Sequence, residues 1–119
     1  MLKKIVKYTD FDGKPQEREY LFNYNKMEIV RLQKSVGGDF DAYLAELQKS
    51  GDVNAIMTFI AKFIVRSLGH RSEDGQSFEK SHKEQKAFEN SAAFEQILDD
   101  LLEHPESMEG FVKATANLK

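Results

Sequence analysis

The stretch that decides the fold is DVNAIMTFIAKFIVRSLG, residues 52–69. Its largest apolar side chains recur every three or four residues, the spacing that gathers them on one face of a helix; they are Ile56, Phe59, Ile60, Phe63 and Ile64. Asp52 stands where an N-cap is expected, and Gly69 where a helix stops. Lys62 and Arg66 interrupt the segment, which also falls short of the ~20 apolar residues of a membrane span. It therefore predicts a buried central helix.

Two segments that resemble β-strands precede this helix. Residues 2–9 and 17–23 are rich in aromatic and β-branched side chains. Between them lies the pair Asp12-Gly13, which favours a turn with positive φ. The pattern predicts a β-hairpin over residues 2–23. An isolated hairpin is only marginally stable in water, so its apolar face is expected to rest on the helices that follow.

Capping residues and apolar spacing predict further helices on both sides of the central one. One is expected over residues 26–36, and others begin after Asp39, Ser81, Ser91 and His104, the last with Pro105 at its first position. Residues 70–80 are polar and lack helical spacing. They are therefore expected to form an exposed loop.

Length and composition favour a single small domain. The chain has 119 residues, of which 40% are hydrophobic and 31% charged, and this is enough apolar surface for one core. The expected fold class is mainly α with an N-terminal β-hairpin (α+β). One domain, residues 1–119, would consist of the hairpin and of a helical part, residues 25–115, that packs on it as a small bundle.

Several classes of protein are excluded by the same numbers. The chain has no cysteine, which rules out a disulfide framework and thiolate zinc sites. Its net charge of −3 is opposite to the basic footprint of a nucleic-acid-binding protein. Only Ile5-Val6 follows the lysines at 3 and 4, so the pattern of a secretory signal peptide is missing. A cytoplasmic protein that binds neither nucleic acid nor membranes is expected.

No arrangement of residues in the sequence indicates catalysis. His70, His82 and His104 lie in separate segments without metal-ligand spacing. The acidic residues between Asp99 and Glu103 are typical of a solvated helix face, and Asp10–Gly13 lacks the later ligands of a calcium loop. Motifs for nucleophilic serines or phosphate loops are also missing. We therefore expect a binding protein rather than an enzyme, without cofactor or metal.

Five stretches follow one another in a recognisable order. They are KYTDFDG at 7–13, EYLFN at 19–23, SLG at 67–69, RSEDGQSFEKS at 71–81 and FENSAAF at 88–94. The most specific are Ser72–Ser81 and Phe88–Phe94. This order, which covers nearly the whole chain, resembles the tail assembly chaperones of long-tailed bacteriophages and prophages of Gram-positive bacteria.

The resemblance implies a small, non-enzymatic protein of the host cytoplasm. Such a protein would bind and solubilise the long tape measure protein and help to recruit subunits of the tail tube protein, without remaining in the virion. Members of the family are often made in two lengths by a programmed frameshift, and this chain is similar to the shorter product. The partners implied are the tape measure protein and the tail tube protein, and self-association is a further expectation.

A chaperone of this kind must offer apolar faces to the helices of its client. The candidate partner-binding residues lie on the second helix and on the last one, because the central helix and the hairpin already suffice for a core. They are Phe40, Tyr43, Leu44, Leu47, Met108, Phe111 and Val112. The alternative, favoured for any single residue, is that these faces complete the core.

The sequence is also compatible with a second class of function and argues against a third. A structural virion protein, such as a head-tail connector or a tail completion protein, would also be small and poor in cysteine. An enzyme or a DNA-binding regulator would require a catalytic constellation or a basic face, and the sequence displays neither.

Overall fold

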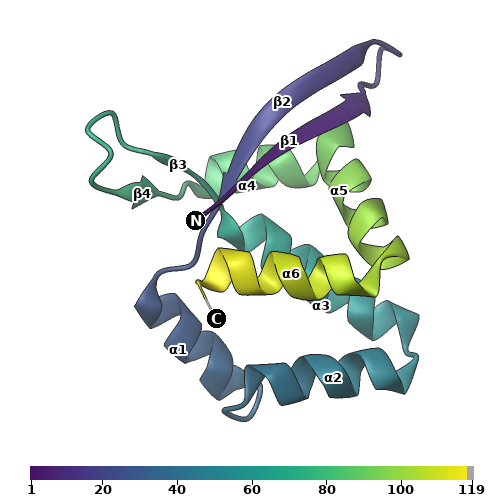
Figure 1. The fold of residues 1–119 in the computed structure, drawn as a ribbon. Coiled ribbons are helices and arrows are strands. Elements are labelled where there is room, and N and C mark those ends of the chain that lie inside the picture. Colours follow the sequence, from purple (N-terminus) through teal and green to yellow (C-terminus); the bar gives the residue numbers. More distant parts are fainter. Residues whose placement is uncertain (118–119) are drawn as a thin grey trace.

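The computed structural model describes residues 1–117, and of Pro105 the backbone alone. The chain begins with a long hairpin of β1 (Leu2–Thr9) and β2 (Pro15–Phe22). The helices are α1 (Lys26–Ser35), α2 (Phe40–Ser50), α3 (Val53–Ser67), α4 (His82–Glu89), α5 (Ala92–Glu103) and α6 (Pro105–Ala116), as Figure 1 shows. The predicted fold class, mainly α with an N-terminal hairpin, is confirmed.

The sheet is larger than the sequence predicts. β1 and β2 pair over their full length, from Leu2 opposite Phe22 to Thr9 opposite Pro15. Two short strands, β3 (Leu68–Arg71) and β4 (Phe78–Glu79), extend the antiparallel sheet in the order β1-β2-β3-β4. The prediction of a loop over residues 70–80 is therefore wrong at both of its ends, where β3 and β4 form a second hairpin.

The second hairpin forms because residues 72–77 make a tight turn that is held by hydrogen bonds within the segment. Ser72 Oγ donates to Asp74 Oδ1 (2.6 Å), and the Gln76 N–H donates to the same oxygen (3.0 Å). Gly75 has a φ of 74°, a conformation that glycine adopts without strain. The turn brings the chain back beside β3, and most of its residues are exposed, as the sequence indicates.

Five helices have the predicted side-chain caps, whereas α6 begins at Pro105 without a side-chain hydrogen bond from His104. The side chain of each capping residue accepts a hydrogen bond from the backbone N–H three residues later, at Asn25, Asp39, Asp52, Ser81 and Ser91. The central helix ends at Ser67, two residues before Gly69, because Leu68 already adopts extended backbone at the start of β3. Its last turn thus leads directly into the sheet.

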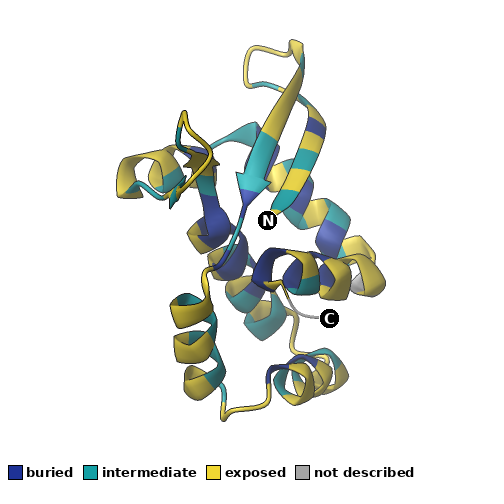
Figure 2. Ribbon diagram, turned by 60° about the vertical axis from the view of Figure 1, so that its left-hand side comes forward, coloured by how far each residue is buried: buried dark blue, intermediate teal, exposed yellow. Residues whose placement is uncertain are grey.

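The core lies where α3, α5 and α6 meet the inner face of the first hairpin. On α3 the side chains of Ile60, Phe63 and Ile64 are buried. Phe22 of β2 is fully buried, with its ring edge-on to Phe88 of α4 and Phe111 of α6. Burial is concentrated on these central elements, whereas α1, α2 and the tip of the hairpin are largely exposed (Figure 2).

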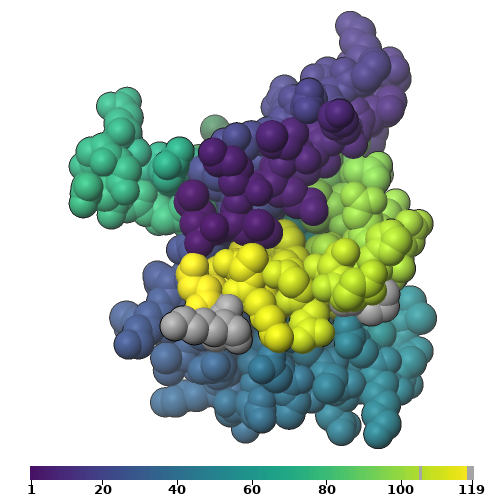
Figure 3. Space-filling model, in the orientation of Figure 1, coloured from purple at the N-terminus to yellow at the C-terminus, as the bar shows by residue number. Residues whose placement is uncertain are grey.

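The two ends of the described chain lie together. The N-terminal ammonium of Met1 donates to Asn117 Oδ1 (2.8 Å), and Asn117 Nδ2 donates to Asn23 Oδ1 (3.1 Å). In the space-filling view, α6 fills the front of the molecule between the first hairpin above and the α1–α2 layer below (Figure 3). The β3–β4 hairpin projects to one side of this body.

Candidate partner-binding surfaces

The seven residues that the sequence offers for partner binding mostly lie inside the protein. Phe40 and Leu44 of α2 are 4% and 5% exposed, and the α6 residues Met108, Phe111 and Val112 are buried as well. Tyr43 and Leu47 are half-buried. The apolar faces of α2 and α6 therefore pack against α3 and β2, and only Tyr43 and Leu47 have substantial surface for a partner in this structure.

The most specific stretch of the sequence, Ser72–Ser81, has structural roles at almost every position. Phe78 places its ring beside Gly69, where a methyl group would clash with that ring and with the Glu79 carbonyl. Lys80 Nζ lies 2.9 Å from Glu28 Oε2 of α1, and Ser81 caps α4. The stretch thus builds the second hairpin and ties it to α1.

The stretch Phe88–Phe94 likewise shapes the fold. The Phe88 ring contacts Tyr20 and Phe94 at centroid distances of 5.1 and 5.5 Å. Ser91 Oγ donates to the Phe88 carbonyl (2.6 Å) and accepts from the Phe94 N–H (3.2 Å). Ala93 is fully buried. These contacts fix the turn between α4 and α5 rather than presenting a surface.

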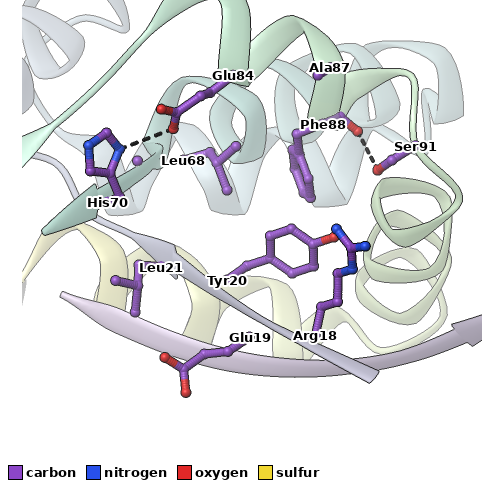
Figure 4. Close-up of a pocket in the computed structure, with 11 residues that line it drawn as sticks. Arg18, Glu19, Tyr20, Leu21, Leu68, His70, Glu84, Ala87, Phe88 and Ser91 are labelled. Atoms are coloured by element: carbon purple, nitrogen blue, oxygen red, sulfur yellow. Dashed lines mark hydrogen bonds and ion pairs between the residues drawn. The ribbon is translucent and has the colours of Figure 1, made fainter. Parts of the chain in front are cut away.

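A hollow of about 410 Å³ lies between β2, β3 and α4 (Figure 4). It begins where β3 stops pairing with β2, since only Leu21 and Phe22 of β2 have partners on β3. Tyr20 points into it toward Phe88, and Arg18 extends alongside the Tyr20 ring. Burial, and next the hydrogen bond with Tyr8, raise the pKa of Tyr20 to about 12, so this phenol stays neutral at physiological pH.

His70 closes one end of that hollow. Its Nδ1 lies 3.1 Å from Glu84 Oε2, and its Nε2 lies 2.9 Å from Glu79 Oε2. The hydrogen bonds to Glu84 and then to Glu79 raise the pKa of His70 above its ordinary value, because both carboxylates favour the imidazolium. His70 thus pairs with both carboxylates and joins β3 to β4 and α4.

A second, larger depression runs along α1 and α3, from the start of α4 at one end to α2 at the other; we call it the α1–α3 groove. It consists of two adjoining hollows of about 490 and 230 Å³, which share Tyr24, Leu32, Ser35 and Arg66 among their lining residues. The smaller hollow has an apolar floor, and this is formed by Tyr24, Leu32, Val36, Tyr43, Phe59 and Phe63.

The floor of the groove is held in place by Tyr24. Its hydroxyl donates to the Phe63 carbonyl (2.6 Å), and its ring lies 4.7 Å from that of Phe63. Burial raises the pKa of Tyr24 well above its usual value, so the hydroxyl remains a donor. The ammonium of Lys80 lies 4.4 Å from the centre of the Tyr24 ring and also pairs with Glu28.

Basic side chains surround this floor. Arg31 of α1 and Lys62 and Arg66 of α3 line the groove and are exposed. None of the ion pairs among residues 1–117 involves these three cations. Among residues 1–117, Glu28 is the single carboxylate that lines the groove, and it is already paired with Lys80. The groove therefore combines an apolar floor with three positive charges that lack an acidic partner within the described part of the chain.

Sequence reasoning did not single out this groove. One signal was available, because Lys62 and Arg66 stand four residues apart on the otherwise apolar central helix and so share a face. The rest of the groove comes from α1, α2, the segment around Tyr24 and the start of α4. The packing of these segments against one another cannot be predicted from the spacing of residues within a single helix or strand.

Within the described part of the chain, no group of three His, Asp or Glu side chains is arranged to hold a metal ion. None of the helices between residues 1 and 117 is long and apolar enough to cross a membrane.

Comparison with known proteins identifies the family. No curated protein and no solved structure matched the chain. A family model described as phage tail assembly chaperone matches residues 1–115. That match includes both hairpins, the groove and all six helices up to Thr115. Because it spans nearly the entire sequence, the chain belongs to the phage tail assembly chaperone family.

Proposed function

We propose that this chain binds and solubilises the tape measure protein and helps to recruit tail tube subunits while the tail is built. The observation that carries the proposal is the family match over residues 1–115. A tail assembly chaperone acts on phage tail proteins, and the tape measure protein is the tail component whose long helical chain most needs shielding from aggregation. Amphipathic helices associate through their apolar faces.

The proposal includes where and how the chain acts. It works in the cytoplasm of a Gram-positive bacterial host, it performs no catalysis, and it leaves before the virion is complete. The α1–α3 groove supports a binding role, because it offers apolar surface together with charges that a partner can satisfy.

Coexpression tests this function. The tape measure protein of the same phage is produced with and without this chain, and its soluble fraction and co-purification with a tagged copy are measured. We expect a clear rise in soluble tape measure protein and its co-elution with the tag. An unchanged soluble fraction with no co-elution would contradict the proposal.

Purified virions provide the second measurement. Mass spectrometry of the particles should find the tape measure and tail tube proteins but not this chain. Its presence at a fixed copy number would instead favour a structural virion protein, such as a connector or completion protein.

A further inference from the structure

We infer that the α1–α3 groove is the docking site for an amphipathic helix of the client that carries acidic side chains beside its apolar face. The inference deepens the proposed function and rests on it for the identity of the client. The chemistry of the occupant is argued from the groove itself.

The shape of the groove suits a helix. Its walls are helices α1 and α3, and α2 closes one end with Tyr43. Helices that bind in such grooves do so with side chains three and four residues apart, which enter the apolar floor. Phe59 contributes to that floor while remaining half-buried, with Tyr43 edge-on to its ring at 5.3 Å. Aromatic surface of this kind loses contact with water when a leucine-like side chain covers it.

The charge of the groove selects the occupant. Arg31, Lys62 and Arg66 have no acidic partner among residues 1–117, although the chain as a whole carries a net charge of −3. Cations gathered around an apolar floor attract a partner with carboxylates at matching positions and repel one with lysines. An acidic, amphipathic helix therefore fits both properties of the groove.

A second copy of this chain does not supply such a helix. The apolar sides of α2, α5 and α6 are largely buried within the same chain. On α3, Val53 and Met57 are exposed, but this helix contains no acidic residue. On α1 the apolar side chains Met27 and Val30 are exposed, but Arg31 and Lys34 follow them by four residues and so share their face, while the adjacent Glu28 is already paired with Lys80. That face carries the same sign of charge as the groove, so the occupant is a different protein.

Binding of synthetic peptides tests the chemistry directly. The probe is a fluorescent peptide of about 18 residues, long enough to form a helix, with leucines on one face and glutamates beside them. A second peptide has glutamine in place of every glutamate. We expect the unaltered protein to bind the glutamate peptide about tenfold more tightly than the glutamine peptide, and this preference should fall as salt is added. Equal affinity for both peptides, or no binding of the glutamate peptide, would overturn the inference.

Charge-reversal variants locate the binding site. Lys62→Glu/Arg66→Glu changes two exposed groove residues, and Lys26→Glu/Lys34→Glu makes the same change of charge on exposed residues that do not line the groove. The groove variant should lose about tenfold or more in affinity for the glutamate peptide, and the control little. An equal loss in both variants assigns the binding to overall charge and contradicts the inference. Ser35→Trp, which fills the groove without changing its charge, should weaken binding of both peptides.

Co-purification with the tape measure protein distinguishes a failure of this inference from a failure of the proposed function. If the tape measure protein co-purifies with the unaltered chain and equally well with Lys62→Glu/Arg66→Glu, the groove is not the client site, while the function stands. If it fails to co-purify with the unaltered chain, the proposed function fails, and the peptides still decide what the groove binds. Thermal midpoints of all variants establish that each one is folded.

Discussion

The ammonium of Lys80 lies 2.9 Å from the carboxylate of Glu28, although the two residues are 52 positions apart in the sequence. Their side chains are only 19% and 32% exposed, so water screens this ion pair less than most surface pairs. Lys80 follows β4, and Glu28 belongs to the first turn of α1. The pair therefore fastens the start of α1 to the second hairpin and forms one end of the α1–α3 groove.

This ion pair should contribute measurably to the stability of α1, which has no fully buried residue of its own. We expect a double-mutant cycle of Lys80→Met and Glu28→Gln to give a coupling of about 1 kcal/mol in urea unfolding. Glutamine at position 28 can still accept from the Asn25 N–H, so the capping box survives and the cycle reports the ion pair. A coupling indistinguishable from zero would show that α1 is held by its apolar side alone.

Gly69 should tolerate no side chain. A methyl group there would meet the Glu79 carbonyl oxygen and the Phe78 ring, and overpacking of this kind costs about 1–3 kcal/mol. Gly69→Ala is therefore expected to destabilise the protein and to increase amide hydrogen exchange in β3 and β4.

Gly110 provides the matched control for that substitution. It lies in α6, and a methyl group added there would meet open space. Replacing a helical glycine by alanine stabilises by about 0.5–1 kcal/mol. Gly110→Ala should thus raise the unfolding midpoint while Gly69→Ala lowers it. If both alanines shift the unfolding midpoint in the same direction, the close approach of Gly69 to β4 does not explain the effect of Gly69→Ala.

The His70 cluster should make the second hairpin sensitive to pH. Glu84 and Glu79 raise the pKa of His70 above its ordinary value of 6.5, so the charged imidazole stabilises the folded state. This contribution is complete below pH 6.5 and is lost as the pH rises through the raised folded-state pKa. The unaltered protein should therefore lose more stability than His70→Gln between pH ~6 and ~8, the range in which histidine titrates.

Nuclear magnetic resonance gives an independent measurement of the same group. The ring protons of His70 should titrate at a higher pH than those of a Glu79→Gln/Glu84→Gln variant, in which both carboxylates are neutral amides. Identical titration curves in the two proteins would mean that neither carboxylate contacts the imidazole in solution.

The apolar face of α6 should behave as core. Phe111 is 4% exposed and lies edge-on to Phe22, and removing a buried aromatic ring costs about 3–5 kcal/mol. Phe111→Ser is expected to abolish folding or to lower the thermal midpoint strongly. Met27→Ser, at a side chain that is 65% exposed, should change stability by less than about 0.5 kcal/mol. A folded Phe111→Ser protein that no longer binds the tape measure protein would instead make α6 a partner surface.

Much of the secondary structure is determined by the sequence alone, because the interactions that specify it are local. Asn25, Asp39, Asp52, Ser81 and Ser91 each begin a helix at the expected position, since a capping side chain acts on a backbone N–H only three residues away. The first hairpin forms around Gly13, whose φ is 78°. Membership of the chaperone family also follows from the sequence, since the match covers residues 1–115.

Only the tertiary structure decided which apolar faces are covered. Residues 68–71 become a strand because the free edge of β2 lies beside Leu68 and Gly69. The sequence of residues 68–71 does not reveal that β2 will lie there. The side chains of Met108, Phe111 and Val112 belong to the core. Phe59, although it belongs to the apolar stripe that predicts the central helix, is only half-buried and forms part of the groove floor. Helical spacing shows that a face is apolar; whether it is buried or left for a partner depends on the segments that pack across from it.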